Sequence, residues 1–205
     1  MSKVIADITM SLDGYVTGPL DSPHGLEDVD ELHAWVAEQD PVDIDILERV
    51  TAETGAVVMG RRLFDIVDGP NGWTKDMGYG AQLAGTLAAT PPFFVVTHTA
   101  PQQVRLEREL GMRFTFVHDL TTAVDQARRA ATGGQVVIMG GGDVIGQAIE
   151  KGLVDELHLH LAPLLLGGGT SLFRAGTRQR YRQRDARPSS HAVHLTYERL
   201  ISAER

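Results

Sequence analysis

The residues best suited to chemistry in this sequence follow an apolar run at positions 135–139. The six that come next suit anion binding: Gly140, Gly141, Gly142, Asp143, Val144 and Ile145. Glycines let a backbone approach a ligand closely, and the free N–H groups that open a helix attract phosphate. This stretch therefore predicts a phosphate cradle between a buried strand and a helix. The alternative is a tight strand-to-helix turn, and the Asp143 carboxylate would repel a phosphate beside it.

A second apolar run, at positions 56–59, is followed by Gly60, Arg61 and Arg62. Arginine in the first turn of a helix opposes the helix dipole, and a bound anion would remove that conflict. Guanidinium groups also bind phosphate through paired hydrogen bonds. Gly60, Arg61 and Arg62 are therefore predicted to contact a phosphate. The alternative is that one arginine is solvated while the other forms an ion pair.

A third apolar run, at positions 92–96, ends in Thr97, His98 and Thr99. Their hydroxyl and imidazole groups suit the extra phosphate that separates NADPH from NADH, and ordinary turn chemistry is the alternative. In open α/β folds ligands bind at the carboxyl ends of the strands. One elongated anionic ligand lying across three such ends would explain all three motifs.

The elements that must position these residues follow from hydrophobic periodicity. Strands are predicted at 3–10, 56–59, 92–97, 114–117, 135–139, 154–161, 178–187 and 191–200. Helices are predicted at 27–39, 43–54, 61–67, 81–89, 120–131 and 142–149. Strands that alternate with helices predict a mostly parallel sheet covered on both faces. The last three strands lack intervening helices, so that end of the sheet should be antiparallel.

Composition narrows the class of protein. The 205 residues, 42% of them hydrophobic, suit a single domain over 1–205. A net charge of −8, with no basic stripe outside Arg178–Arg187, argues against nucleic acid as a partner. The absence of cysteine excludes a disulfide framework, a zinc–thiolate site and a cysteine nucleophile. No basic leader and no membrane-spanning apolar run is present, so we expect a cytoplasmic protein with a small-molecule ligand and no metal.

Taken in order, the motifs resemble the dihydrofolate reductase-like family. They are most similar to stand-alone relatives of the reductase domain of the riboflavin-biosynthesis protein RibD, its C-terminal domain. The matching blocks are Ser11–Val16, Val58–Phe64, Val95–His98, Met139–Ile145, Gly152–Leu157 and Ala162–Phe173. Together they reach from residue 3 to about residue 200.

The resemblance implies a three-layer α/β fold with a central, mostly parallel sheet and antiparallel C-terminal strands. It implies that NADPH binds with its pyrophosphate at Gly141–Ile145 and its adenosine-side phosphate near Arg61, Arg62 and Thr97–Thr99. It also implies hydride transfer to a pterin-like or ribitylamino-pyrimidine-like heterocycle, as in 5-amino-6-(5-phosphoribosylamino)uracil reductases.

The same resemblance places the Ser11–Val16 segment beside the nicotinamide and the substrate. Asp13 is then the candidate catalytic residue, which would orient the substrate or relay a proton, although it also suits a turn before Gly14. The candidate substrate contacts are Ser11, Gly14, Trp35 and Leu165. Trp35 also suits a place in the core.

One departure from the family keeps two other functions open. In dihydrofolate reductases an acidic residue on the first long helix lies three positions before an aromatic residue, whereas Leu32 lies three before Trp35. The alternatives to the reductase just described are dihydrofolate reductase activity itself and a non-catalytic NADP-binding regulatory domain.

His158 and His160 lie two apart on a predicted strand and so share one of its faces. Two histidines so placed could begin a metal site, but no third ligand is adjacent. A face exposed to solvent or to an interface is the favoured interpretation. This strand and its partners could then pair across a two-fold axis in a homodimer.

Overall fold

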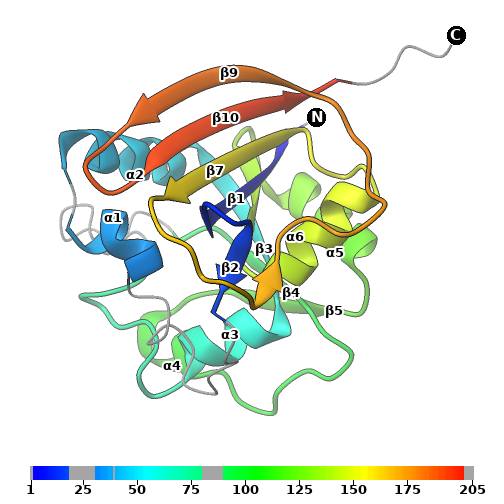
Figure 1. The fold of residues 1–205 in the computed structure, drawn as a ribbon. Helices are drawn as coiled ribbons and strands as arrows, with labels where there is room; N and C mark the ends of the chain where they lie inside the picture. The colour runs from blue at the N-terminus through cyan, green and yellow to red at the C-terminus, as the bar shows by residue number, and fades with distance from the viewer. Residues whose placement is uncertain (1, 19–30, 39, 80–89, 201–205) are drawn as a thin grey trace, which may run out of the picture.

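The computed structural model describes residues 2–18, 31–38, 40–79 and 90–200. Its main sheet has eight strands in the order β5-β4-β3-β6-β1-β7-β10-β9 (Figure 1). Their bounds are β1 Val4–Ser11, β3 Thr54–Gly60, β4 Phe93–Val96, β5 Phe114–Val117, β6 Gln135–Met139, β7 Glu156–Ala162, β9 Tyr181–Pro188 and β10 Val193–Arg199. Two short strands, β2 (Tyr15–Thr17) and β8 (Thr170–Ser171), form a separate antiparallel pair.

Strands β1 and β3 to β7 run parallel, whereas β10 is antiparallel to β7 and β9 is antiparallel to β10. This confirms the predicted mostly parallel sheet with an antiparallel C-terminal end. The described helices are α1 Ala34–Ala37, α2 Pro41–Glu53, α3 Arg61–Asp68, α4 Arg105–Leu110, α5 Leu120–Ala130 and α6 Gly142–Glu150, with a 3-10 turn at Glu31–His33.

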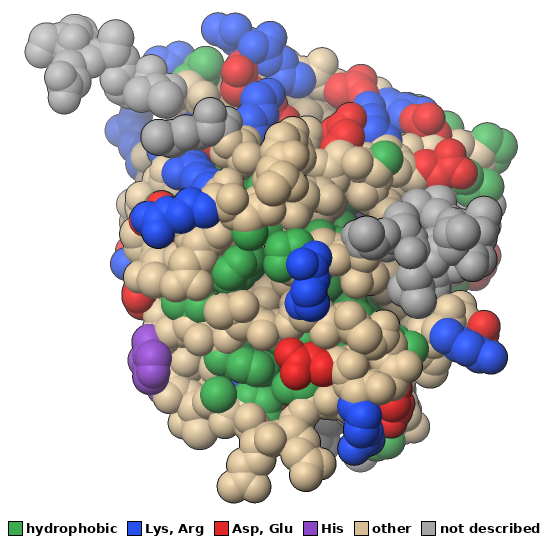
Figure 2. All heavy atoms as spheres, turned by 180° about the vertical axis from the view of Figure 1, so that it is seen from behind, with side chains coloured by type: hydrophobic (Ala, Val, Ile, Leu, Met, Phe, Trp, Pro, Cys, Tyr) green, Lys and Arg blue, Asp and Glu red, His purple; other side chains and the backbone are tan. Residues whose placement is uncertain are grey.

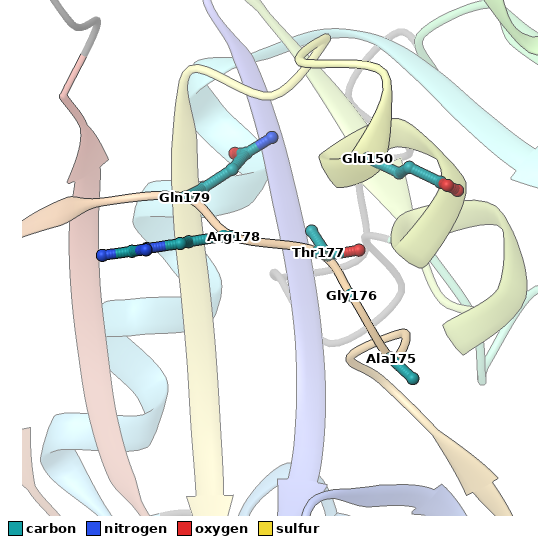
Figure 3. Close-up of a pocket in the computed structure, with 6 residues that line it drawn as sticks. All are labelled: Glu150, Ala175, Gly176, Thr177, Arg178 and Gln179. Carbon is teal, nitrogen blue, oxygen red and sulfur yellow. The ribbon is translucent and has the colours of Figure 1, made fainter.

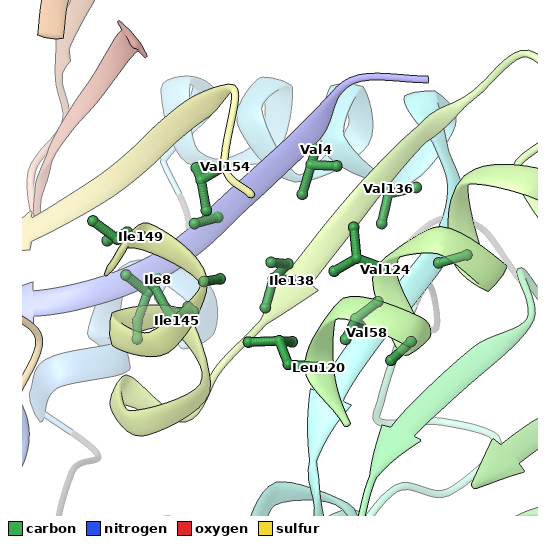
Figure 4. Packing of buried hydrophobic residues seen from close by; sticks show 14 of the residues in the cluster. Val4, Ile8, Val58, Leu120, Val124, Val136, Ile138, Ile145, Ile149 and Val154 are labelled. Atoms are coloured by element: carbon green, nitrogen blue, oxygen red, sulfur yellow. The ribbon is translucent and has the colours of Figure 1, made fainter. Parts of the chain in front are cut away.

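Helices cover both faces of the sheet. On one face α5 and α6 pack over β1, β3 and β6 (Figure 4). This core is built from branched aliphatic side chains, which include Val4, Val58, Val124, Val136, Ile138, Ile145 and Ile149. Parallel strands buried on both faces read as continuous apolar runs, which is why β3, β4 and β6 were recognisable in the sequence.

The opposite face carries two different environments. Over β3 and β4, α3 and α4 pack an apolar cluster that contains Phe64, Phe93 and Leu106. Over β1, β7 and β10, α1 and α2 contribute Trp35 and Ile46 to a small cluster. The second environment also contains polar side chains, which are described with the site.

Some predicted elements differ from the observed ones. In the described part of the predicted helix 27–39, the chain forms a 3-10 turn followed by the single-turn α1. Residues 27–30 and 39 lie outside the described residues, and so does the predicted helix 81–89. Helix α2 starts at Pro41 because Asp40 caps it, accepting from the backbone of Val42 and Asp43. The sequence did not predict α4, β2 or β8, each six residues or fewer.

The arginine-rich run near the C-terminus is an exposed edge strand, β9, as its polarity predicts. Arg184 pairs with Glu198 of β10, and Arg187 pairs with Asp45 of α2. Figure 2 shows basic and acidic side chains interspersed over the upper part of the face that it presents. That nucleic acid is not a partner stays a prediction.

The core makes a direct stability prediction. Ile138 is fully buried on β6 between β3 and β1. Replacing Ile138 with alanine should leave a cavity and lower the free energy of unfolding by about 2–5 kcal/mol. Urea denaturation measures this, with the exposed Ile44→Ala on α2 as the control. Equal midpoints for the two variants would contradict the observed core.

Candidate functional site

The order of the strands brings the predicted motifs together. Strands β4, β3, β6 and β1 are consecutive neighbours in the sheet and run parallel. Their carboxyl ends carry Thr97, Gly60, Gly140 and Ser11 along one edge. With strands about 4.8 Å apart, this row spans about 14 Å. An extended dinucleotide could lie across it.

The three glycines after β6 have different roles. Gly141 is the N-cap of α6, has a positive φ of 76° and is capped by no side chain. A Cβ built on Gly141 would meet no atom within 4 Å, so the space above it is open. Gly140 also has a positive φ, of 53°. Gly142 is tightly packed, since a Cβ there would lie 2.5 Å from the Val16 side chain.

The residues that open α6 hold the helix in place. The Asp143 carboxylate accepts hydrogen bonds from Arg174 and from Gln147, so its charge is balanced by a guanidinium. Ile145 is fully buried, and its N–H donates to the Gly141 carbonyl at 3.1 Å. The Ile145 amide is therefore used within the helix, and contact between Ile145 and a phosphate stays a prediction.

Val144 joins the second motif to the first. A Cβ on Gly60 would lie 2.7 Å from the Val144 side chain, so the first turn of α6 packs directly on the end of β3. Gly60 is in turn the N-cap of α3, and no side chain caps that helix. The two glycine turns therefore face the same stretch of the sheet edge.

Arg61 links the second motif to the third. Its Nε donates to Asp65 at 2.7 Å and its Nη1 donates to the Thr99 carbonyl at 2.5 Å. The ion-paired alternative thus holds for Arg61, while Arg62 is exposed. The Thr97 hydroxyl accepts from the Thr99 amide at 3.2 Å, which is turn chemistry. His98 is exposed.

Asp13 fastens two loops together. Its Oδ1 accepts from the Ser11 hydroxyl at 2.6 Å and from the Leu166 amide at 3.1 Å, and its Oδ2 accepts from the Gly167 amide at 2.7 Å. The Ser11 hydrogen bond is the main reason that the pKa of Asp13 lies below its ordinary value. An ionised, acceptor-only carboxylate suits a positioning role better than proton donation. Contact between Asp13 and a substrate stays a prediction.

The other candidate substrate residues lie in contrasting environments. The Ser11 hydroxyl is buried and bonded, while Gly14 has a φ of 89° with open space beside it. Leu165 is 71% exposed. Trp35 is only 5% exposed, and its Nε1 donates to the Thr9 hydroxyl. Trp35 thus takes its alternative place in the core, and its contact with a substrate stays a prediction.

The interpretation of His158 and His160 as an exposed face is wrong. His160 is 3% exposed and stacks on Trp35 with ring centroids 4.2 Å apart. Strand β7 is also paired on both sides, by β1 and β10, so it offers no edge to another copy. Helices α1 and α2 cover this face of the sheet, and the sequence pattern did not show where they would pack. The alternation of histidine with leucine was the available signal for two differently packed faces.

A surface cavity of about 420 Å³ lies at the far end of α6 (Figure 3). It is lined by Glu150 on the last turn of the helix and by Ala175–Gln179. The nine-residue helix separates it from Gly141 by about 13 Å. The cavity is therefore separate from the phosphate cradle.

Two further features are absent from the described ranges. Among those residues, no three His, Asp or Glu side chains are grouped as metal ligands. No helix within them is long and apolar enough to cross a membrane.

The comparison with protein families decides the relationship. The sequence model of the RibD C-terminal domain matches residues 2–195. The chain belongs to the RibD C-terminal domain family. That the domain extends over all of 1–205 stays a prediction. No curated protein matches the chain.

Solved structures share the fold of this RibD C-terminal domain protein. A protein from Shewanella sp. PV-4, described as a riboflavin biosynthesis protein, is 21% identical, with a TM-score of 0.65 over 98% of this chain and 100% of its own. A deaminase/5-amino-6-(5-phosphoribosylamino)uracil reductase from Thermotoga maritima is 12% identical, with a TM-score of 0.62 over 97% of this chain and 57% of its own. Dihydrofolate reductase from Enterococcus faecalis, complexed with NADP(H), is 15% identical, with a TM-score of 0.56 over 96% of each chain.

These likenesses confirm the dihydrofolate reductase-like fold. Family membership and the reductase neighbours together support an oxidoreductase of the RibD type. The cofactor, the substrate, the homodimer and the cytoplasmic location predicted from the sequence are finer statements and stay predictions.

The Asp13 hydrogen bonds make a testable prediction. Asp13→Ala should speed hydrogen exchange at the Leu166 and Gly167 amides, because their acceptor is removed. In the unchanged protein both amides should stay protected above the ordinary carboxyl pKa of 3.8, and lose protection as pH falls through the lowered pKa of Asp13. Asp125→Asn, an exposed carboxylate on α5, is the control. Unchanged exchange in Asp13→Ala would refute the fastening role.

Proposed function

We propose that this chain is an NADPH-dependent reductase that delivers hydride to a pterin-like or ribitylamino-pyrimidine-like heterocycle. The observation that carries the proposal is the row of carboxyl ends on β4, β3, β6 and β1, beside an α6 N-terminus that no side chain caps and that has open space at Gly141. Support also comes from the neighbours, one named as a 5-amino-6-(5-phosphoribosylamino)uracil reductase and one complexed with NADP(H).

The residues present fit the cofactor. Gly141 offers open space at a helix N-terminus, where backbone N–H groups and the helix dipole favour a pyrophosphate. The pairing of Asp143 with Arg174 removes most of the like-charge repulsion toward that phosphate. Arg61, Arg62 and Thr97–Thr99 would receive the adenosine-side phosphate, with Arg61 releasing its contact to Asp65.

Bound NADPH would supply a hydride, and the protein would supply orientation and exclusion of water. Ser11 and Asp13 hold the Ser11–Val16 loop against the loop at 164–169 through their hydrogen bonds. That contact fixes one wall beside the end of β1. Leu165, exposed on the second loop, would lie over the ring of a planar substrate.

Leu32 bears on the two alternatives, dihydrofolate reductase activity and a non-catalytic NADP-binding domain. It is 1% exposed and packs with Ala162, Leu164 and Leu166, so no acid occupies the position expected for dihydrofolate reduction. A non-catalytic NADP-binding domain would retain the cradles and lack turnover. The proposed reductase and a non-catalytic domain are distinguished by following the absorbance of reduced nicotinamide with pterins, flavins and ribitylamino-pyrimidines. Binding without turnover on any of them would favour the non-catalytic domain.

The proposal predicts cofactor selectivity. Replacing both Arg61 and Arg62 with alanine should weaken NADPH binding by roughly tenfold or more and leave NADH binding almost unchanged, because only NADPH carries the extra phosphate. Calorimetric titration measures both affinities. Arg129→Ala, an exposed arginine on α5, is the matched control.

Equal losses for NADPH and NADH would show that these arginines do not read the extra phosphate. If the folded, unchanged protein gave neither heat nor a melting shift with NADPH, the reductase proposal itself would be wrong.

A further inference from the structure

A row of carboxylates and imidazoles lies on the sheet face beneath α1 and α2. His194 of β10 and His160 of β7 face each other with their Nδ1 atoms 2.7 Å apart. The Nε2 of His194 contacts Asp43 of α2 at 2.8 Å, and the Nε2 of His160 contacts Asp7 of β1 at 3.2 Å. We call Asp43, His194, His160 and Asp7 the buried relay.

The contact distances within the buried relay set the number of protons that it needs. Three contacts of hydrogen-bond length join its four groups, and each needs one proton between its two heavy atoms. Two neutral imidazoles with two ionised carboxylates would supply only two. To hold all three contacts as hydrogen bonds the buried relay requires three protons, and the third would put one positive charge on the histidine pair when both carboxylates are ionised.

The groups around the buried relay support this distribution. Burial raises the pKa of Asp7, but the charge of His160 and contacts with His158 outweigh it and hold that pKa below its ordinary value. Burial and the neighbouring His160 lower the pKa of His194, which opposes a second extra proton. Arg187 of β9 acts on His194 in the same direction. Asp7 is thus held as an ionised carboxylate.

Asp7 has acceptor capacity that the described residues leave unused. His160 provides the one hydrogen bond to its Oδ1, and its Oδ2 is buried without a hydrogen-bond partner, 3.8 Å from the His158 Nδ1. An ionised carboxylate can accept about four hydrogen bonds. The Asp7 side chain is also 20% exposed, although β1 has a strand on each side. The helix layer therefore leaves part of the Asp7 side chain exposed, and a ligand would have to enter beneath that layer to reach the buried Oδ2.

The pairing register of β1 with β6 places Asp7 beside the sheet edge at which the cofactor is proposed to bind. Asp7 pairs with Met139, the last residue of β6, and Gly140 follows at once. Beyond this point β1 continues alone with β7 as far as Ser11. A ligand lying over Gly140 and Gly141 would therefore abut β1 between Asp7 and Ser11.

We propose that Asp7, backed by the His160–His194 pair, is the anionic contact for a protonated or N–H-donating nitrogen of the substrate heterocycle. The inference rests on the reductase function proposed above. It gives the site an acid from strand β1 in place of the one absent at Leu32. It also selects nitrogen heterocycles that can carry a positive charge over neutral or anionic ones.

The charge of Asp7 has a chemical consequence. A fixed carboxylate raises the pKa of a nearby C=N nitrogen and favours its protonated form, which accepts hydride more readily at carbon. Hydride addition forms the C–H bond, the π pair moves onto nitrogen and cancels its charge, and the nicotinamide is the group oxidised. The nitrogen keeps its proton throughout, so Asp7 need not become protonated.

Binding of a small cation tests the contact. The probe is 2-aminopyridinium, a planar cation with two N–H donors along one edge. It is titrated by NMR into the full chain with and without NADPH, with neutral aniline for comparison. Asp7→Asn should weaken 2-aminopyridinium binding roughly tenfold to a hundredfold, because a charged hydrogen-bonded contact is lost. Asp125→Asn should leave that binding unchanged, and NADPH affinity should be the same in all three proteins.

The outcomes separate the two proposals. Absence of NADPH binding would remove the reductase function, and the free protein would still report on Asp7. The Asp7 contact is wrong if the unchanged protein fails to prefer 2-aminopyridinium over aniline, or if Asp7→Asn binds the cation equally well.

The shared proton has its own measurement. In protein labelled with ¹⁵N-histidine, the Nδ1 atoms of His160 and His194 should report one proton between them, which His194→Gln should abolish. His191→Gln, a partly exposed histidine on the turn before β10, is the matched control and should leave the signal unchanged. Two imidazoles titrating independently near the ordinary pKa of about 6.5 would overturn the proton count.

Discussion

The parallel pairing of β6 with both β3 and β1 is the constraint on which the rest of the structure depends. It places the ends of three strands that are distant in sequence next to one another, and β4 extends the row. Because side chains alternate across a strand, the same pairing sends Ala6 and Ile8 to the α5/α6 core and Asp7 and Thr9 to the other face. The sheet edge and the polar face are two results of one register.

Close packing of backbone then turns the sheet edge into a shaped site. Neighbouring side chains occupy the space beside Gly60 and Gly142, whereas the space beside Gly141 is open. The loops at 11–16 and 164–169 are joined by Asp13 and by the Leu12 amide, which donates to the Leu164 carbonyl at 2.9 Å. The site is thus held by hydrogen bonds between loops and by packing between helices.

Burying the charged side chains on the sheet face beneath α1 and α2 costs free energy, which their pairing offsets. Buried charges are unfavourable unless they are paired and hydrogen-bonded, and the buried relay meets this condition at Asp43, His194 and His160. Asp43 also accepts from the Asp40 amide, so the same side chain closes the N-terminus of α2 and fixes that helix over β10. Asp7 is the member whose acceptors are only partly used, which makes it the point at which the network can meet a ligand.

The sequence by itself determined the buried parallel strands, because such strands are continuous apolar runs, and it marked the ends of β3 and β6 with glycine. β5 and β6 were predicted to the residue, and Gly60, Thr97 and Gly140 were correctly placed at strand ends. Only the tertiary structure decided that His160 is buried against Trp35, that Asp13 joins two loops, and that Asp7 and Asp43 are linked through His160 and His194. The contacts of Asp7 with His160 and of Asp43 with His194 join residues 153 and 151 positions apart. Strand order and helix packing bring these residues together, and local periodicity carries no record of either.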